Sequence, residues 1–211
     1  MSVTYELYPK IALNELLDDL MFDLPDLPDA AAVQFLRRAS IKMCREGNLL
    51  RRRAFICTQP CVNNYILEPV DCVEVVAVMS TRNVTGSLRG RVVRLTQEPA
   101  EIPCGMYSWW TPPNEVHFTQ VGENYSYEVT FSVAPKFDAC EIDAELVNKY
   151  YELLLLGAKS YAHDLNDKPW TNLSKSRDYT SQFIQGIRMA AVETMLGGQR
   201  GVSRYRKMRV L

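Results

Sequence analysis

The sequence predicts an α+β fold: a helical bundle from both chain ends, an inserted antiparallel β-module and an extended C-terminal arm. Residues 1–50 and 137–196 carry apolar side chains at the three- and four-residue spacing that is typical of helices. Residues 51–136 carry short alternating runs between turn residues, which is typical of strands. Residues 197–211 are basic and offer little apolar surface to bury. We therefore expect three parts, with the helices of the two ends packed together.

Two helices are expected before residue 50. Residues 11–22 place leucines along one face and acids on the other, which predicts a short helix. A proline-containing segment then interrupts the pattern. Asp26 is expected to cap the second helix, with Pro28 in its first turn. This helix is expected to run to Glu46 and to end at Gly47.

The β-module is expected to contain six strands, at residues 53–58, 64–68, 72–79, 90–96, 115–119 and 125–134. The nearly continuous apolar run at 72–79 favours a strand that is covered on both faces. The alternation at 125–134 places its aromatic and β-branched side chains on one face. Residues 98–114 contain four prolines and are expected to form an irregular loop.

Two longer helices are expected after the β-module. Asp143 is expected to cap a helix that runs to about Asp164, and Asn172 or Thr171 to cap one that runs to about Leu196. Each has one apolar stripe, so the two helices are expected to pack as an antiparallel pair.

Charge is strongly segregated although the formal net charge is only −1. Residues 1–30 hold seven acids and one lysine, whereas residues 197–211 hold five basic side chains and no acid. Residues 31–196 hold eighteen of each and are neutral. This distribution suits head-to-tail contact with copies of the same chain or with a partner, but two solvated termini would explain it equally well.

Composition indicates an ordinary soluble globular protein, with 47% hydrophobic and 23% charged residues. No run of eighteen apolar residues is present, and the N-terminus lacks the pattern of a signal peptide, so no membrane association is expected. The six cysteines are expected to be reduced and mostly buried. Cys57 and Cys61 are not followed by a second pair at zinc-site spacing, so no metal is expected.

Motifs for catalysis are missing from the sequence. It has no phosphate-binding glycine loop, no nucleophile elbow and no paired histidines at metal-ligand spacing. His117 is expected to be a half-buried packing residue, and His163 to form a surface pair with Asp164. We therefore expect neither an enzyme nor a cofactor.

Two features favour contact with other molecules. Arginines on or beside the β-module could face DNA or a protein partner: Arg51, Arg52, Arg53, Arg89 and Arg91. The clusters at 51–53 and 82–94 would suit a soluble nucleic-acid-binding module, although arginines at strand edges that pair with nearby acids explain them as well. Trp109-Trp110 could be a contact tip or a plug that closes the β-core.

The order of these elements resembles a known family. The helix at 145–162, the linker at 166–170, the helix through 179–191 and the basic arm look like those of head-to-tail adaptor (connector) proteins of tailed bacteriophages. The helix that opens at 24–29 is similar to the first long helix of adaptors from short-tailed phages. Residues 114–118 are similar to the strand that enters their inserted β-domain.

The resemblance implies a structural virion protein, made in the host cytoplasm and located in the neck between head and tail. Such adaptors form a homo-oligomeric ring, typically of twelve copies, below the portal protein and next to a tail or nozzle protein. DNA passes through the ring without sequence-specific binding during genome ejection. The resemblance assigns docking into the portal to the arm, with the side chains Arg200, Arg204, Tyr205, Arg206, Lys207, Arg209, Val210 and Leu211.

Overall fold

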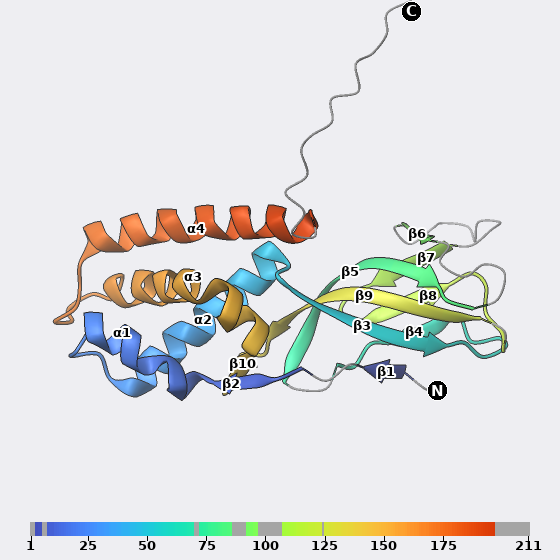
Figure 1. Ribbon diagram of the computed structural model, residues 1–211, viewed down its shortest axis with the longest axis horizontal. Helices are drawn as coiled ribbons and strands as arrows, with labels where there is room; N and C mark the ends of the chain where they lie inside the picture. Colours follow the sequence, from blue (N-terminus) through green and yellow to red (C-terminus); the bar gives the residue numbers. More distant parts are fainter. Residues whose placement is uncertain are drawn as a thin grey trace, which may run out of the picture.

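The computed structural model confirms the α+β class, and the larger sheet lies apart from the helices (Figure 1). It describes residues 3–5, 8–69, 72–85, 92–96, 107–123 and 125–196. The helices gather at one end of an elongated molecule and the large sheet extends from the other (Figure 1). Within these residues, no helix is long and apolar enough to cross a bilayer.

The N-terminal region contains β1 (Val3–Tyr5), β2 (Lys10–Ala12), the 3₁₀ helix η1 (Leu13–Leu16), α1 (Leu17–Asp23) and α2 (Asp29–Gly47). The single helix predicted over 11–22 is therefore wrong in its first half. The backbone of residues 10–12 pairs instead with β10 (Glu141–Asp143), in antiparallel register. Only a strand far along the chain makes this pairing available, so local periodicity could not reveal it.

Helix α2 occupies almost the predicted residues, but its ends differ. Pro28, not Asp26, is the N-cap residue, and no side chain caps the helix there. At the other end Asn48 takes a left-handed conformation with φ 49° and its N–H reaches the carbonyl of Cys44. Apart from glycine, asparagine is the residue type that best tolerates this conformation. Gly47 is the last helical residue, where a Cβ would lie 2.8 Å from Leu49 Cγ.

The larger sheet has the strand order β1-β3-β9-β5-β6-β7-β8-β4. Its other strands are β3 (Leu50–Cys57), β4 (Asn64–Ile66), β5 (Val73–Asn83), β6 (Val92–Thr96), β7 (Tyr107–Thr111), β8 (Glu115–Phe118) and β9 (Ser126–Pro135). Their pairings are antiparallel except that of β6 with β7, which is parallel. The expected purely antiparallel module is therefore wrong in this one pairing. The sheet curls enough for Phe118 to stack on Tyr127 at 4.1 Å between ring centroids.

Strand β7 corrects the prediction of an irregular loop over 98–114. Tyr107–Thr111 pairs with β8 as a hairpin, and Pro112 and Pro113 lie in the turn, where a missing N–H costs no ladder bond. The aromatic content of this segment suits a pleated surface. Trp109 stacks on His117 with ring centroids 4.9 Å apart, which confirms His117 as a half-buried packing residue.

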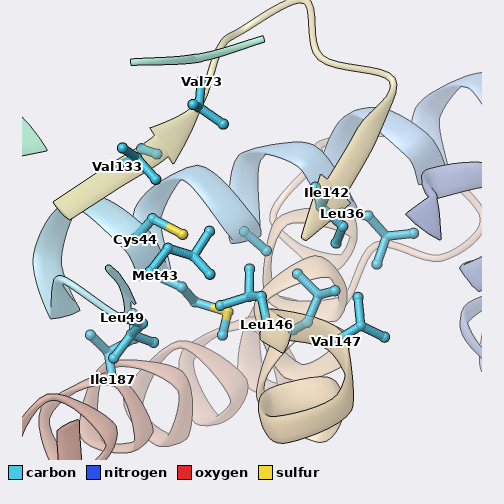
Figure 2. Packing of buried hydrophobic residues seen from close by; sticks show 14 of the residues in the cluster. Leu36, Met43, Cys44, Leu49, Val73, Val133, Ile142, Leu146, Val147 and Ile187 are labelled. Atoms are coloured by element: carbon cyan, nitrogen blue, oxygen red, sulfur yellow. The ribbon is translucent and has the colours of Figure 1, made fainter. Parts of the chain in front are cut away.

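The core is continuous from the sheet into the bundle. Strand β9 buries Tyr127, Val129, Phe131 and Val133 completely, as its alternation predicted. Figure 2 shows Val133 beside Met43 and Cys44 of α2, with residues of both later helices packed below. Strand β5 is less covered than expected, because residues 74–77 in its first half remain only half-buried.

Helices α3 (Ala144–His163) and α4 (Leu173–Met195) form the expected antiparallel pair (Figure 1). Because α4 folds back over the end of α3, His163 is buried, donates from Nδ1 to the carbonyl of Trp170 at 2.6 Å and stacks on Tyr179. The predicted surface pair of His163 with Asp164 is therefore wrong.

The cap at the start of α4 gives a first testable prediction. Asn172 Oδ1 accepts the N–H of Lys175 at 3.0 Å, as the sequence indicated. Asn172→Ala is expected to lower the free energy of unfolding by about 1 kcal/mol, measured by urea denaturation, because one N–H of the first turn loses its partner. Asn172→Asp keeps the acceptor and serves as the control. An equal loss in both variants would contradict the capping role.

Candidate interaction surface

Strand geometry divides the three consecutive arginines of β3. Side chains alternate across a strand, so Arg52 points inward with Leu50 and Ala54, whereas Arg51 and Arg53 lie on the opposite face. Arg52 is only 5% exposed. The prediction that it faces DNA or a partner is wrong, and its alternation with buried neighbours was the signal that could have shown this.

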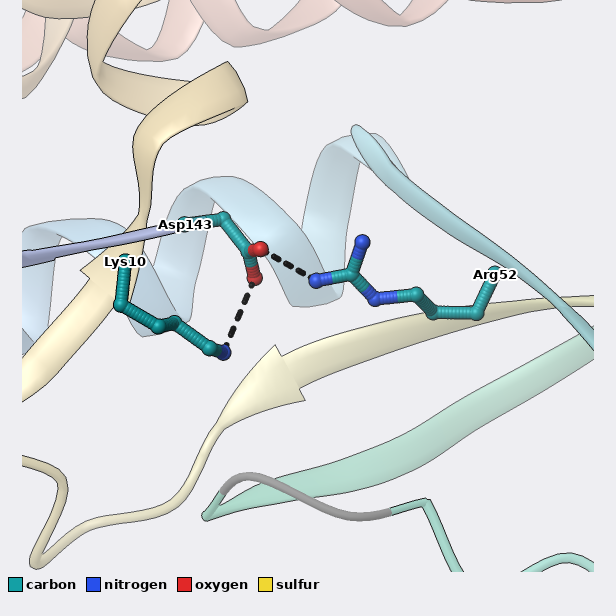
Figure 3. Close-up of polar contacts among 3 residues, drawn as sticks. All are labelled: Lys10, Arg52 and Asp143. Carbon is teal, nitrogen blue, oxygen red and sulfur yellow. Dashed lines mark hydrogen bonds and ion pairs between the residues drawn. The ribbon is translucent and has the colours of Figure 1, made fainter. Parts of the chain in front are cut away.

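The partner of Arg52 is Asp143, at the junction of β10 and α3. The Arg52 guanidinium donates from Nη2 to Asp143 Oδ1, and Lys10 Nζ lies 3.5 Å from Asp143 Oδ2 (Figure 3). The ring of Tyr8 lies 3.3 Å from the Arg52 guanidinium carbon. Asp143 is 1% exposed and is the N-cap residue of α3, as predicted, but its carboxylate makes no capping bond to the helix. This cluster joins the N-terminal segment, the sheet and the bundle, which is a structural role.

The other predicted arginines do not form one exposed patch in the part of the chain that the structure describes. Arg51 is half-buried, and its Nε has no hydrogen-bond partner there. Arg53 is exposed and its Nε lies 3.7 Å from Glu128 Oε1. Arg89 and Arg91 lie outside the described residues, as do all the predicted docking side chains of the arm at 197–211.

The end of α4, directly before the arm, exposes an apolar surface. Met189, Val192, Met195 and Leu196 are each more than half exposed. Three of them, together with residues of α3, border a hollow of about 740 Å³, which is lined by Tyr150, Leu153, Gly186, Met189, Val192 and Leu196. We call this hollow the α4 groove. A contiguous exposed apolar surface of this kind marks an interaction site more often than isolated apolar side chains do.

The shape of the α4 groove follows from two local features. Helix α3 kinks at Tyr150, whose φ of −132° and ψ of 29° are not helical, and the Tyr150 hydroxyl lies 3.1 Å from Thr194 Oγ1. Gly186 admits Leu153 so closely that an added Cβ would lie 2.4 Å from Leu153 Cδ1. The absence of a side chain at Gly186 therefore lets the two helices approach closely and leaves the bottom of the groove open.

Charged side chains border this apolar floor. Arg188 and Glu193 line the groove, and Lys149 Nζ lies 5.0 Å from the centroid of the Tyr150 ring. A hydrogen bond with Tyr150 and the negative charge of Glu193 and Glu145 raise the pKa of Lys149 further above neutral pH, where a lysine is ordinarily protonated. An apolar centre with a charged rim is the usual layout of a protein–protein contact.

The α4 groove was not predicted from the sequence, because only the apolar stripe of α4 that faces the core was considered and not the apolar residues on the opposite face. Phe183, Ile187 and Ala190 belong to the apolar stripe that was expected on this helix, and they are buried. Met189, Val192 and Leu196 also repeat at three- and four-residue spacing, on the exposed face of the helix. A second apolar stripe that reaches the arm was the available signal.

Comparisons with known proteins identify a solved structure of low similarity. No protein-family model and no curated protein matches the chain. Among solved structures, it is similar to a chain described as "Neck of empty GTA particle computed with C6 symmetry", with 16% sequence identity and a TM-score of 0.30. The match covers 85% of this chain and 95% of that one. Agreement at this level carries no conclusion about function.

Proposed function

We propose that this chain is a structural protein of a bacteriophage virion, an adaptor of the short-tailed type. Copies form a ring, of twelve in the related adaptors, between the portal of the head and the tail or nozzle protein, and DNA passes through it. The single observation that carries the proposal is an exposed apolar groove at the end of α4, a helix that is followed in the sequence by a segment with five basic side chains and no acid. The weak likeness to a particle neck is compatible with this role and adds no support of its own.

The chemistry of the arm suits docking into another protein. Gly197, Gly198 and Gly201 allow the backbone to adapt, and arginine binds carboxylates in two-pronged pairs. Tyr205 and the terminal Val210-Leu211 supply apolar anchors. Ordering such a segment costs conformational entropy, which repeated copies around a ring offset through multivalency. The proposal assigns no reaction, metal or cofactor to the chain.

Removal of the arm tests this proposal. A chain of residues 1–196 is expected to keep its melting temperature, because α4 ends before the arm, and to bind the portal about a hundredfold more weakly or not at all. Binding is measured by light scattering and by titration of the portal with the full and shortened chains. A variant with the five basic arm residues changed to glutamine separates charge from length. Equal portal binding by the full and shortened chains would refute the assignment of the arm.

The same full and shortened chains, titrated with duplex DNA, test the alternative that the protein is a soluble nucleic-acid-binding module. Burial of Arg52 removes one member of the proposed basic cluster, and Arg53 already has an acidic neighbour. We therefore expect weak, non-specific duplex DNA binding that disappears at moderate salt. Tight DNA binding that depends on the arm, together with no binding to the portal, would favour the alternative.

A further inference from the structure

We propose that Phe22 of one copy inserts into the α4 groove of the next copy, so that copies join head to tail through these two surfaces. The inference rests on the ring in the proposed function and names the contact that builds it. It follows from the shape, the charge and the placement of two surfaces at opposite edges of the bundle.

Phe22 is an exposed aromatic side chain on α1. It is 87% exposed, the highest value among the large apolar side chains that the structure describes. Its neighbours Leu17 and Leu20 point into the core, which fixes Phe22 on the outer side of α1. A projecting aromatic ring on a rigid element is the type of side chain that anchors protein contacts.

Acids surround Phe22. Asp18, Asp19 and Asp23 lie on the same helix, and residues 11–30 hold six acids and no basic side chain. Two of them are held in place by α3: Tyr151 donates its hydroxyl hydrogen to Asp19 at 2.6 Å, and Lys159 pairs with Asp23. The projecting ring of Phe22 therefore lies next to several aspartates on an ordered helix.

The α4 groove offers the complementary surface. Its floor is apolar and its volume of about 740 Å³ is large enough for an aromatic side chain. Arg188 lines it together with the acidic Glu193. Lys149 lies beside the lining residue Tyr150, and the five basic residues of the arm follow α4 in the sequence. Opposite charges around an apolar contact favour one partner and one orientation.

Placement prevents a chain from filling its own groove. Figure 1 shows α1 and α4 along opposite edges of the bundle, and α3 contacts both helices. The projecting Phe22 and the α4 groove are therefore different surfaces of the chain. A contact between them is heterologous, because each copy contributes a different surface. A heterologous contact repeated from copy to copy closes into a ring or continues as a filament.

Photo-crosslinking tests the contact directly. The full-length chain carrying p-benzoylphenylalanine at position 22 is irradiated at high protein concentration, and the crosslinked peptides are identified by mass spectrometry. We expect covalent dimers joined to residues 185–196. The same probe at Phe137, which is also exposed, is the control and is expected to give no crosslink to this segment. Absence of dimers, or crosslinks from position 22 to another surface such as that around Lys42, overturns the proposal.

Paired variants test whether the contact is heterologous. Phe22→Asp and Val192→Asp are each expected to weaken self-association about thirtyfold in sedimentation experiments, with unchanged thermal unfolding because both side chains are exposed. Phe137→Asp and Leu173→Asp change apolar residues elsewhere that are also at least half exposed, and these variants are expected to associate like the original chain. Equal effects of all four substitutions would overturn the proposed contact.

A mixture of the two variants gives the sharpest result. The Phe22→Asp chain keeps its groove and the Val192→Asp chain keeps its projection, so the mixture has one intact contact per pair and should form dimers of one copy of each. Larger species or no dimers would contradict the geometry. Portal binding through the arm is measured separately: copies that bind the portal without this contact refute only the contact, and copies that associate but ignore the portal refute only the proposed function.

Discussion

Replacement of Asp143 by alanine is expected to lower the free energy of unfolding by about 3–5 kcal/mol, one of the two largest effects that the structure predicts. The substitution leaves the Arg52 guanidinium buried without its counter-charge, and Lys10 loses the same partner. Most of the loss reflects the cost of an uncompensated buried charge rather than the net value of the pair. Denaturation with urea, followed by circular dichroism, measures the change.

Two comparisons make this prediction specific. The exposed pair of Arg45 and Glu74 is the matched control: Glu74→Ala should cost no more than about 1 kcal/mol, because water replaces the lost partner. Replacing both Arg52 and Asp143 with apolar residues of similar volume should recover most of the loss. If Asp143→Ala were as mild as Glu74→Ala, the buried cluster would not hold the sheet to the bundle.

The second large effect is expected at the contact between the three main helices. Phe183 of α4 is 1% exposed and packs over Gly157 of α3, opposite Ala39 of α2. Phe183→Ala should cost about 3–5 kcal/mol, because burial of the ring is lost and a cavity remains. Gly157→Ala should cost about 1–3 kcal/mol for the opposite reason, since a Cβ at 157 would lie 2.6 Å from Phe183 Cζ.

Combining the two substitutions tests the contact itself. With Phe183 shortened, the added methyl of Gly157→Ala enters space that the ring has left, and alanine favours the helix more than glycine does. The second substitution should therefore cost less in that background than in the original chain, with a coupling energy above about 0.5 kcal/mol, although Ala39 Cβ, 2.8 Å from the added methyl, still opposes it. Additive losses in the double variant would show that the two residues do not share this packing. Calorimetry of the four chains completes the cycle.

Local sequence patterns determined the parts of the fold that depend on neighbouring residues. The periodicity of α2, α3 and α4 and the alternation of β9 each report a face that must be buried, and Asn172 caps the helix that begins beside it. The same reasoning failed where a distant partner decided the outcome. Ile11 lies in a strand because β10 is available to pair with it. Asp143 keeps the N-cap position of α3, but its carboxylate binds Arg52 instead of the first turn of the helix.

The sequence by itself determined the α+β class, the acidic start and the basic end, because spacing and charge are properties of the chain. Only the tertiary structure decided that Arg52 is buried, that Trp109 and Trp110 lie in a strand, and that Met189 and Val192 border an open groove. These outcomes depend on which surfaces meet after the chain has folded. A residue's neighbours in space, rather than in sequence, determine whether its charge or its apolar surface is satisfied internally or remains available to another molecule.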